Sequence, residues 1–289
     1  MQLQRSNSTI TIPDGSEIQS ALQRTTHLGI GAHHDDLEFF AYHGIDACYG
    51  RSDRWFTGVT CTDGAGSARV GPYESFTDEE MAAIRIEEQN KAAVVGEYAA
   101  MIQLGYPSSE IKDPGHGGPV DDLEAVLRAA KPEELYLHNP ADKHDTHIAV
   151  LLRSLAAVRR LPVEDRPRKT WGCEIWRGLD WLVDDDKGLL STSSRPNLQA
   201  ALNGVYDSQI MGGKRYDLAV MGRRLANATF HDSHSADEET GITWAIDLSP
   251  VVLDNSVDIV EFTLGFIDRL RHDVASRLER FMIPRASKP

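Results

Sequence analysis

The first half of the chain alternates between short apolar runs and longer segments in which apolar residues recur with a helical period. The short runs predict buried strands, because each is continuous and is bounded by glycine or polar residues. These runs cover residues 27–32, 55–60, 100–104 and 134–138. The periodic segments predict helices at residues 79–98, 121–130 and 147–158. Strands that alternate with helices are typical of a parallel sheet with helices packed on its faces.

The second half follows the same pattern less regularly. It predicts a strand at residues 169–176 and helices at residues 197–211, 216–227 and 257–281. No internal repeat or low-complexity linker divides the chain, so we expect one Rossmann-like α/β domain over residues 1–289. Its sheet is expected to be mostly parallel, with helices on both faces and a C-terminal extension that covers the functional site.

Composition narrows the class of protein and the class of partner. With 41% hydrophobic and 26% charged residues, the chain resembles ordinary globular proteins. Its net charge of −14 argues against nucleic-acid binding, which depends on lysine and arginine. Its three cysteines are widely spaced and form no CxxC pair, which favours a reducing cytoplasm. No segment is typical of an export signal or a membrane helix, so we expect an unexported protein without a membrane partner.

Ionisable residues gather directly after two of the predicted strands. The segment 32–38, Ala-His-His-Asp-Asp-Leu-Glu, follows the first strand, and the histidine-rich segment 138–147 follows the strand at 134–138. Because the carboxyl ends of parallel strands share one edge of a sheet, we expect both clusters at the edge where α/β proteins bind ligands.

The first cluster has the residue types of a metal site. Successive residues beyond a strand end point in different directions, so we expect His33 and Asp36 to converge on one ion while Asp35 faces a water molecule. One further ligand, from the second cluster, completes such a site. Helix capping by the aspartates is the structural alternative, but capping is compatible with metal binding and explains only part of the pattern.

The two clusters resemble the motifs of the LmbE-like, or PIG-L, family of N-acetylglucosaminyl deacetylases. The first resembles the family's Ala-His-Pro-Asp-Asp-x-Glu, with His34 at the proline position. Residues 142–147 resemble Asp-x-His-Pro-Asp-His, with Asp145 and Thr146 in place of proline and aspartate. Weaker matches lie at Thr62 to Gly66, Arg85, Glu88, Ser208 and Gln209. The region beyond Asn227 shows no resemblance.

This resemblance implies a role for each ionisable residue. His33, Asp36 and His147 correspond to zinc ligands, Asp35 to the general base and His144 to the electrophilic or acid partner. Two histidines and a carboxylate also suit a catalytic Zn²⁺ on chemical grounds, since they leave a position for a water whose pKa falls to about 7. A cationic His144 is expected to stabilise the oxyanion, with Asp142 orienting its imidazole and favouring its charge.

Three residues are candidates for contacting substrate: Arg69, Asp142 and His116. Arg69 follows a glycine-rich loop and has the donors to hold sugar hydroxyls, although an exposed charge explains it equally well. His116 also lies in a glycine-rich loop, where histidines are usually solvated. His34 is left out of the metal set, because a residue at the proline position is expected to pack or to face solvent.

The sequence therefore predicts a zinc-dependent hydrolase that removes an N-acyl group, acetyl being the simplest, from an amino sugar or sugar conjugate. Its expected partner is that small molecule, and association with further copies of the chain stays open. Two alternatives remain. One is an amidase for another N-acyl conjugate, such as a thiol sugar or an antibiotic intermediate. The other is a non-catalytic metal- or sugar-binding relative, since His34 and Thr146 depart from the family motifs.

Overall fold

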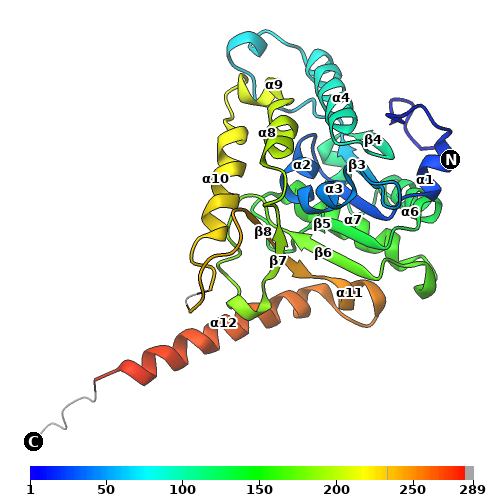
Figure 1. Ribbon diagram of the computed structural model, residues 1–289. Helices are drawn as coiled ribbons and strands as arrows, with labels where there is room; N and C mark the ends of the chain where they lie inside the picture. The colour runs from blue at the N-terminus through cyan, green and yellow to red at the C-terminus, as the bar shows by residue number, and fades with distance from the viewer. Residues whose placement is uncertain (233, 284–289) are drawn as a thin grey trace, which may run out of the picture.

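The chain folds around one mixed sheet of eight strands (Figure 1). The computed structural model describes residues 1–232 and 234–283. The sheet has the order β1-β4-β3-β2-β5-β6-β8-β7. Its five central strands are parallel: β4 (Ala100–Tyr106), β3 (Phe56–Thr62), β2 (His27–Gly31), β5 (Glu134–His138) and β6 (Lys169–Cys173). The predicted mostly parallel α/β sheet is confirmed.

Three short strands at the edges run antiparallel to their neighbours, and the sequence pattern did not predict them. They are β1 (Thr9–Thr11) beside β4, β8 (Ile242–Asp247) beside β6, and β7 (Gly188–Ser191) beside β8. Because all strands join one sheet, the expectation of a single domain over residues 1–289 is consistent with this topology, and it stays a prediction.

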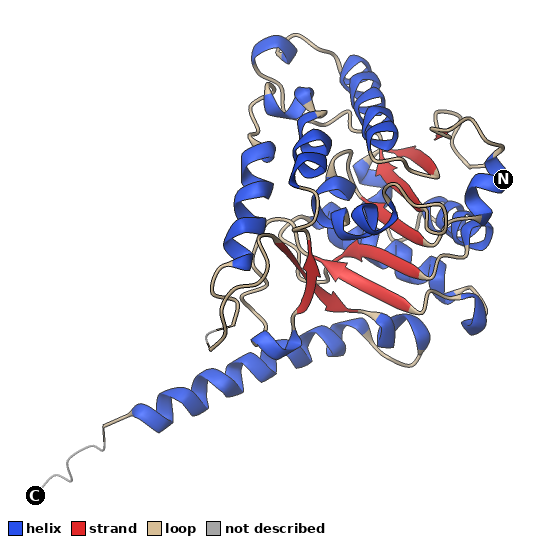
Figure 2. Ribbon diagram, viewed as in Figure 1, coloured by secondary structure: helices blue, strands red, loops and turns tan. Residues whose placement is uncertain are grey.

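Helices cover both faces of the sheet (Figure 2). One face carries α1 (Ile18–Gln23), α5 (Ser108–Lys112), α6 (Gly118–Ala130), α7 (Asp145–Arg159) and α11 (Ser249–Leu253). On the other side lie α2 (Asp36–Phe40), α3 (Tyr42–Cys48), α4 (Asp78–Val95), α8 (Pro196–Gly204), α9 (Asp207–Ile210) and α10 (Tyr216–Ala228). Three short 3₁₀ turns lie at Gly71–Tyr73, Val163–Asp165 and Asp184–Asp186.

The last helix, α12 (Ile259–Phe281), runs along one side of the sheet layer and then projects beyond the body of the molecule (Figure 1). Only Phe266 of this helix is buried. Among the described residues, none of the helices has both the length and the unbroken apolar character that crossing a bilayer requires.

The expected helix at 197–211 is interrupted, because the chain turns between α8 and α9. Gly204 ends α8, and Tyr206 then points into the core, where its hydroxyl lies 2.5 Å from Glu38 Oε2. A buried carboxylate needs such donors. A tertiary hydrogen bond therefore outweighs the helical periodicity of this segment.

Strand order places a crevice between β2 and β5. From β2 the chain proceeds to β3 and β4 on one side, and it then crosses to β5 and β6 on the other. In open α/β sheets this reversal of winding separates the loops that leave the two central strands, and ligands bind there. Both histidine-rich clusters follow these two strands, as the sequence predicted.

Close packing of α2 on the sheet depends on glycines in the strands. A Cβ atom on Gly29 would lie 2.9 Å from both Leu37 Cδ2 and Phe56 Cζ, inside the second hydrophobic core. Interiors at this packing density accommodate an extra methyl group only by displacing neighbours. Gly29 thus fixes how closely α2, and the residues before it, approach β2.

We predict that Gly29→Ala lowers the free energy of unfolding by about 1–3 kcal/mol, because the new methyl group overpacks the core. Gly204→Ala is the matched control, since a Cβ there meets nothing within 4 Å. Urea denaturation of both variants measures the difference. Equal stability of Gly29→Ala and the unsubstituted protein contradicts the packing argument.

Candidate metal centre

The turn after β2 brings two aspartates to the edge of the sheet with different orientations. A Cβ atom on Gly31 would lie 3.0 Å from Asp36 Cβ, so glycine lets Asp36 fold back against the strand end. Asp35 has a φ of 94°, a left-handed conformation that costs about 1–3 kcal/mol for a residue with a side chain. This strained turn directs the Asp35 side chain toward Arg85 and that of Asp36 toward His147.

The three predicted zinc ligands lie side by side. His33 Nδ1 is 3.2 Å from His147 Nε2 and 3.5 Å from Asp36 Oδ2, and Asp36 Oδ1 is 3.5 Å from His147 Nε2. Ligands placed about 2.0–2.1 Å from a tetrahedral Zn²⁺ are separated from one another by about 3.3 Å. These donor types suit a divalent cation. Among the described residues, two groups have donor atoms close enough to share one ion, His33 with His144 and His147, and Asp36 with His138 and His147.

His147 is oriented by a buried carboxylate. Its Nδ1 donates to Asp142 Oδ2 at 3.0 Å, which leaves the Nε2 lone pair directed at Asp36 and His33. The other carboxylate oxygen, Asp142 Oδ1, accepts from the backbone N–H of His144 at 2.8 Å. The expectation that Asp142 orients the His144 ring is wrong, because both of its oxygens are used elsewhere. A carboxylate bound to the other ring nitrogen, as Asp142 is to His147, normally strengthens metal binding by a histidine.

Asp35 and Asp36 lie in different electrostatic surroundings. Burial raises the pKa of Asp35 to about 8, although the adjacent Arg85 guanidinium, 3.2 Å away, opposes the shift. Burial alone would also raise the pKa of Asp36, but the neighbouring His147 and His138 hold it well below its usual range. One carboxylate is thus suited to accept a proton, and the other stays ionised.

His144 is held as a neutral imidazole. Burial and the nearby His33 and His147 lower its pKa. Its Nδ1 accepts the backbone N–H of Thr146 at 3.2 Å, at the start of α7, so the proton of the neutral ring resides on Nε2. The expected cationic form is therefore not favoured, because burial and the neighbouring His33 and His147 oppose a charge on this ring. A neutral Nε2–H group can still donate a hydrogen bond.

One histidine of the site was not singled out from the sequence. His138, the last residue of β5, is fully buried and stacks on His147 with ring centroids 4.0 Å apart. Its Nε2 accepts the Ala32 N–H at 3.0 Å and lies 3.3 Å from Asp36 Oδ2, while burial lowers its pKa to about 4. Its position at a strand end was visible, but its contacts depend on β2 and β5 being neighbours.

The donor groups open into a cleft of about 650 Å³. Polar side chains from both clusters line its floor, and the aromatic residues Trp176 and Tyr216 line its wall with ring centroids 4.9 Å apart. Gln209 and Lys214 complete this wall. The expected C-terminal cover is correct only in part. The described residues beyond Asn227 do not line the cleft, because β8 joins the sheet on the far side of β6 and α12 leads away from it.

All three substrate-contact candidates lie outside the cleft lining, and Asp142 instead binds His147 and the His144 N–H. Arg69 Nη2 is 2.5 Å from Asp78 Oδ1, which holds the guanidinium in a surface ion pair. His116 Nε2 is 3.3 Å from Glu110, and its Nδ1 accepts the Gly118 N–H at the start of α6. His34 packs as expected: it is fully buried and its Nε2 lies 2.9 Å from Gln103 Oε1.

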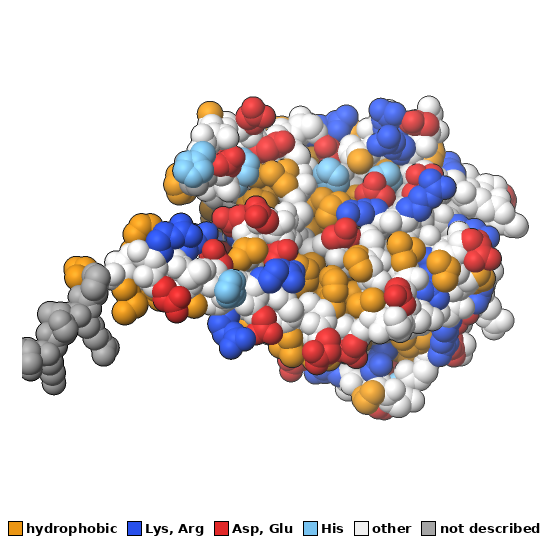
Figure 3. All heavy atoms as spheres, turned by 90° about the horizontal axis from the view of Figure 1, so that it is seen from below, with side chains coloured by type: hydrophobic (Ala, Val, Ile, Leu, Met, Phe, Trp, Pro, Cys, Tyr) orange, Lys and Arg blue, Asp and Glu red, His pale blue; other side chains and the backbone are white. Residues whose placement is uncertain are grey.

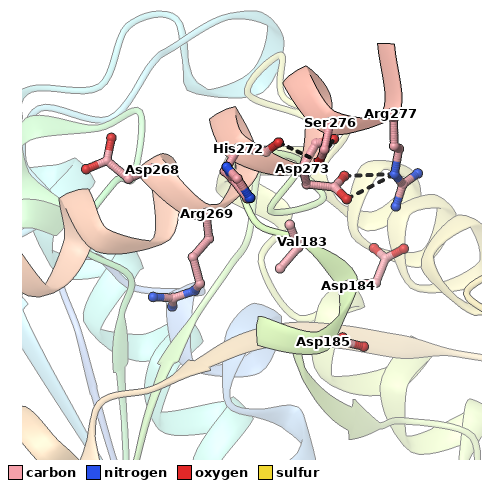
Figure 4. Close-up of a pocket in the computed structure, with 9 residues that line it drawn as sticks. All are labelled: Val183, Asp184, Asp185, Asp268, Arg269, His272, Asp273, Ser276 and Arg277. Atoms are coloured by element: carbon pink, nitrogen blue, oxygen red, sulfur yellow. Dashed lines mark hydrogen bonds and ion pairs between the residues drawn. The ribbon is translucent and has the colours of Figure 1, made fainter. Parts of the chain in front are cut away.

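A second hollow, of about 640 Å³, lies beneath α12 (Figure 4). Its arginines are already paired, Arg269 with Asp186 at 2.6 Å and Arg277 with Asp273 at 2.9 Å. Within residues 1–232 and 234–283, the triads of His, Cys, Asp or Glu donors close enough to share an ion all lie at the cleft between β2 and β5. We therefore assign the chemistry to that cleft.

Residues 28–158 match the model of a protein family described as PIG-L, GlcNAc-PI de-N-acetylase. This part of the chain is similar to the PIG-L family. The matched segment contains both clusters and four of the five central strands. No curated protein matches the chain.

Solved structures share the fold of the PIG-L segment and much of the rest of the chain. A 4-carboxy-2-hydroxymuconate hydratase from Pseudomonas putida is 16% identical, with a TM-score of 0.59 over 78% of this chain and 96% of its own. The N,N'-diacetylchitobiose deacetylase from Pyrococcus horikoshii is 17% identical, with a TM-score of 0.57 over 76% and 83%. A deacetylase of teicoplanin biosynthesis is 13% identical, with a TM-score of 0.53 over 77% and 98%. At such identities the likeness concerns the fold, which hosts both hydratases and deacetylases.

We predict that Asp142→Asn lowers zinc affinity about 10–100-fold, because the amide no longer holds His147 in its metal-binding orientation as a carboxylate does. Asp145→Asn is the control, since Asp145 is an exposed neighbour at the start of α7. Competition against a fluorescent zinc chelator measures both affinities. Equal affinities for the two variants contradict the orienting role.

Proposed function

We propose that this chain is a metal-dependent N-deacylase that hydrolyses the amide bond of an N-acylated amino sugar or sugar conjugate. The observation that carries the proposal is the grouping of His33, Asp36 and His147 at 3.2–3.5 Å beside the buried carboxylate of Asp35. The family match adds that related sequences are described as de-N-acetylases.

His33, Asp36 and His147 are the side chains that would hold the cation, and zinc suits this donor set. When bound, such an ion supplies a polarising charge and lowers the pKa of a water molecule toward neutrality. Asp142 and the strained turn at Asp35 contribute by fixing the donors before the ion arrives. This preorganisation lowers the entropic cost of assembling the site.

Asp35 is proposed as the proton carrier. Its pKa, raised by burial, makes it a stronger base than an exposed aspartate, and Arg85 fixes the orientation of its carboxylate. It takes a proton as water attacks the acyl carbon, and it returns that proton to the nitrogen when the C–N bond breaks. The products are a free carboxylic acid and an amine.

His144 is proposed to donate its Nε2–H to the acyl oxygen as negative charge develops there. Its Nδ1 is occupied by the Thr146 N–H, so the donor faces away from α7. A neutral donor is effective in this role when it is fixed in place before the reaction. With Thr146 at the position of the motif's aspartate, His144 still has a hydrogen-bond donor at Nε2, which argues against a non-catalytic relative.

The substrate is proposed to be an amino sugar, because Trp176 and Tyr216 offer aromatic surface beside the polar floor of the cleft. A different N-acyl conjugate, such as a thiol sugar or an antibiotic intermediate, fits the same chemistry. Teicoplanin biosynthesis uses a deacetylase of similar fold. A panel of N-acetyl sugars and longer N-acyl conjugates, assayed for release of acetate or of the larger acid, distinguishes these substrates.

We also propose that the enzyme acts in the cytoplasm as a single domain without nucleic-acid or membrane partners. Its three cysteines are buried and unpaired, which suits a reducing compartment.

We predict that Asp35→Asn retains one zinc ion per chain but loses activity about 10²–10⁴-fold, because the amide cannot carry the proton. His147→Ala is expected to lose both metal and activity. Metal content by elemental analysis and amine release from N-acetylglucosamine or its oligomers measure the two effects separately. Retention of metal by His147→Ala contradicts the ligand assignment, and full activity of Asp35→Asn contradicts the base assignment.

A further inference from the structure

Three lysines from segments that are distant in the sequence line the cleft. Lys112 ends α5, Lys143 precedes α7, and Lys214 precedes α10. All three are exposed, and none pairs with an acidic side chain in the described part of the chain. Lysines elsewhere do form such pairs, at Lys131, Lys169 and Lys187.

The floor of the same cleft holds further unused donors. Arg85 is 2% exposed, and its Nη2 group serves Asp35 and the backbone oxygen of His34. Its Nε and Nη1 atoms have no hydrogen-bond partner among the described residues, and Nη1 comes no closer than 3.9 Å to Glu88. Each buried donor without a partner costs about 1–3 kcal/mol, so a ligand acceptor accounts for this arrangement.

Building on the proposed function, we propose that the substrate carries an oxyanion, a phosphate or a carboxylate, beside its N-acyl group. A chain with a net charge of −14 repels anions over most of its surface. In the cleft lining the three lysines and Arg85 outnumber the three aspartates, so this region attracts an anionic substrate better than the rest of the surface does. In this proposal the lysines bind the anionic group of the substrate. Arg85 donates hydrogen bonds to substrate oxygens that lie closer to the reacting amide.

Paired substrates test this proposal: N-acetylglucosamine, its 6-phosphate, and N-acetylmuramic acid as the carboxylate. We expect kcat/KM to be at least about tenfold higher for a charged sugar at low salt, and the preference to shrink as salt screens the lysines. Lys112→Met and Lys143→Met should reduce this preference. Lys91→Met, an exposed lysine outside the cleft lining, should leave the preference unchanged.

Binding of the same sugars, measured by calorimetry, tests the anion site separately from the proposed deacylase function. Tighter binding of a charged sugar that is lost in Lys143→Met supports the anion site even without turnover, in which case only the proposed function fails. Equal affinity for charged and neutral sugars overturns the anion site, whether or not both are hydrolysed.

Independently, the sequence of α12 contains an exposed seam of heptad spacing. Apolar residues recur at alternating intervals of four and three along one side of the helix, interrupted only by Arg271. The seam consists of Val260, Leu264, Ile267, Arg271, Val274, Leu278 and Phe281. Exposure of its apolar members ranges from 41% at Ile267 to 78% at Phe281. Such a repeat is the pattern by which two helices pack together.

The body of the protein does not bury this seam. Phe262 and Phe266 pack α12 against the core, and they lie on a different side of the helix from Leu264 and Ile267. Farther along, the inner face turns polar at Asp273 and borders the hollow of Figure 4. Hydrophobic side chains are visible on the projecting part of α12 in Figure 3.

We infer that the seam pairs antiparallel with α12 of a second copy. The first half of the helix and its N-cap have the acidic charges Asp258, Glu261 and Asp268 against Arg269 alone, whereas the second half has three arginines against Asp273 and Glu279. An antiparallel pair places each acidic half beside a basic half, whereas a parallel pair places like charges together. The heptad register then sets Leu264 opposite Phe281 of the second copy.

The area of such a pair suits a weakly associating dimer. If each of the five apolar seam residues from Leu264 to Phe281 buries on the order of 100 Å², two copies together remove about 1,000 Å² from water, the size of a weak specific interface. Arg271 in the middle of the seam lowers this stability, but a single polar position fixes register and the number of chains. A dimer with a measurable dissociation constant is therefore expected.

Light scattering after size-exclusion chromatography of the full chain tests the dimer. Leu278→Glu should raise the dissociation constant by about 100-fold or more, because it buries a charge in the seam. Leu218→Glu is the matched control, since Leu218 is a similarly exposed leucine, 60%, on α10. A monomer at all concentrations, binding of the unsubstituted monomer to phospholipid vesicles through α12, or an undiminished Leu278→Glu dimer overturns the proposal.

Cysteine cross-linking tests the orientation, since the three natural cysteines are buried. Leu264→Cys and Phe281→Cys chains should cross-link when mixed, and each alone should not. Self-cross-linking of Leu264→Cys would falsify the antiparallel arrangement.

Discussion

The position of the Asp36 carboxylate is the constraint on which the candidate site depends. Its Oδ2 atom accepts the backbone N–H of His33 at 2.7 Å, and its two oxygens lie within 3.5 Å of ring nitrogens of His33, His138 and His147. This arrangement joins the turn after β2 to the loop after β5. It is sterically permitted because Gly31 leaves room for the Asp36 side chain against the strand end.

Around Asp36, neighbouring groups of similar chemistry are given different roles by their surroundings. Asp35, one residue earlier, is buried beside a single arginine, so its pKa rises and it is suited to proton transfer. His147 and His144 lie three residues apart on α7, yet one is bound to a carboxylate and the other to a backbone N–H. Differences in hydrogen bonding and burial therefore suit these residues to the different roles that we propose for them, as ligand, base and hydrogen-bond donor.

Fold resemblance by itself does not decide the reaction. A hydratase and two deacetylases share this architecture at 13–17% identity. We propose amide hydrolysis because of the site, where candidate metal donors, a buried carboxylate with a raised pKa and a neutral hydrogen-bond donor lie at one cleft. Two other properties are proposed from surface residues. The lysines that line the cleft are proposed to favour an anionic substrate, and the apolar seam on α12 is proposed to form a dimer.

The sequence by itself determined the central parallel strands, the two clusters and their common edge, because a continuous apolar run followed by ionisable residues leaves few alternatives. It also identified His33, Asp36 and His147, which the fold brings together. Short edge strands, the break before Tyr206 and the burial of His138 were decided by tertiary contacts, which act between segments far apart in the chain. For the same reason only the folded structure revealed that Asp142 serves His147, that Arg69 is held by Asp78 and that His144 is neutral. Hydrogen-bond partners and pKa values depend on three-dimensional neighbours, which motif spacing does not specify.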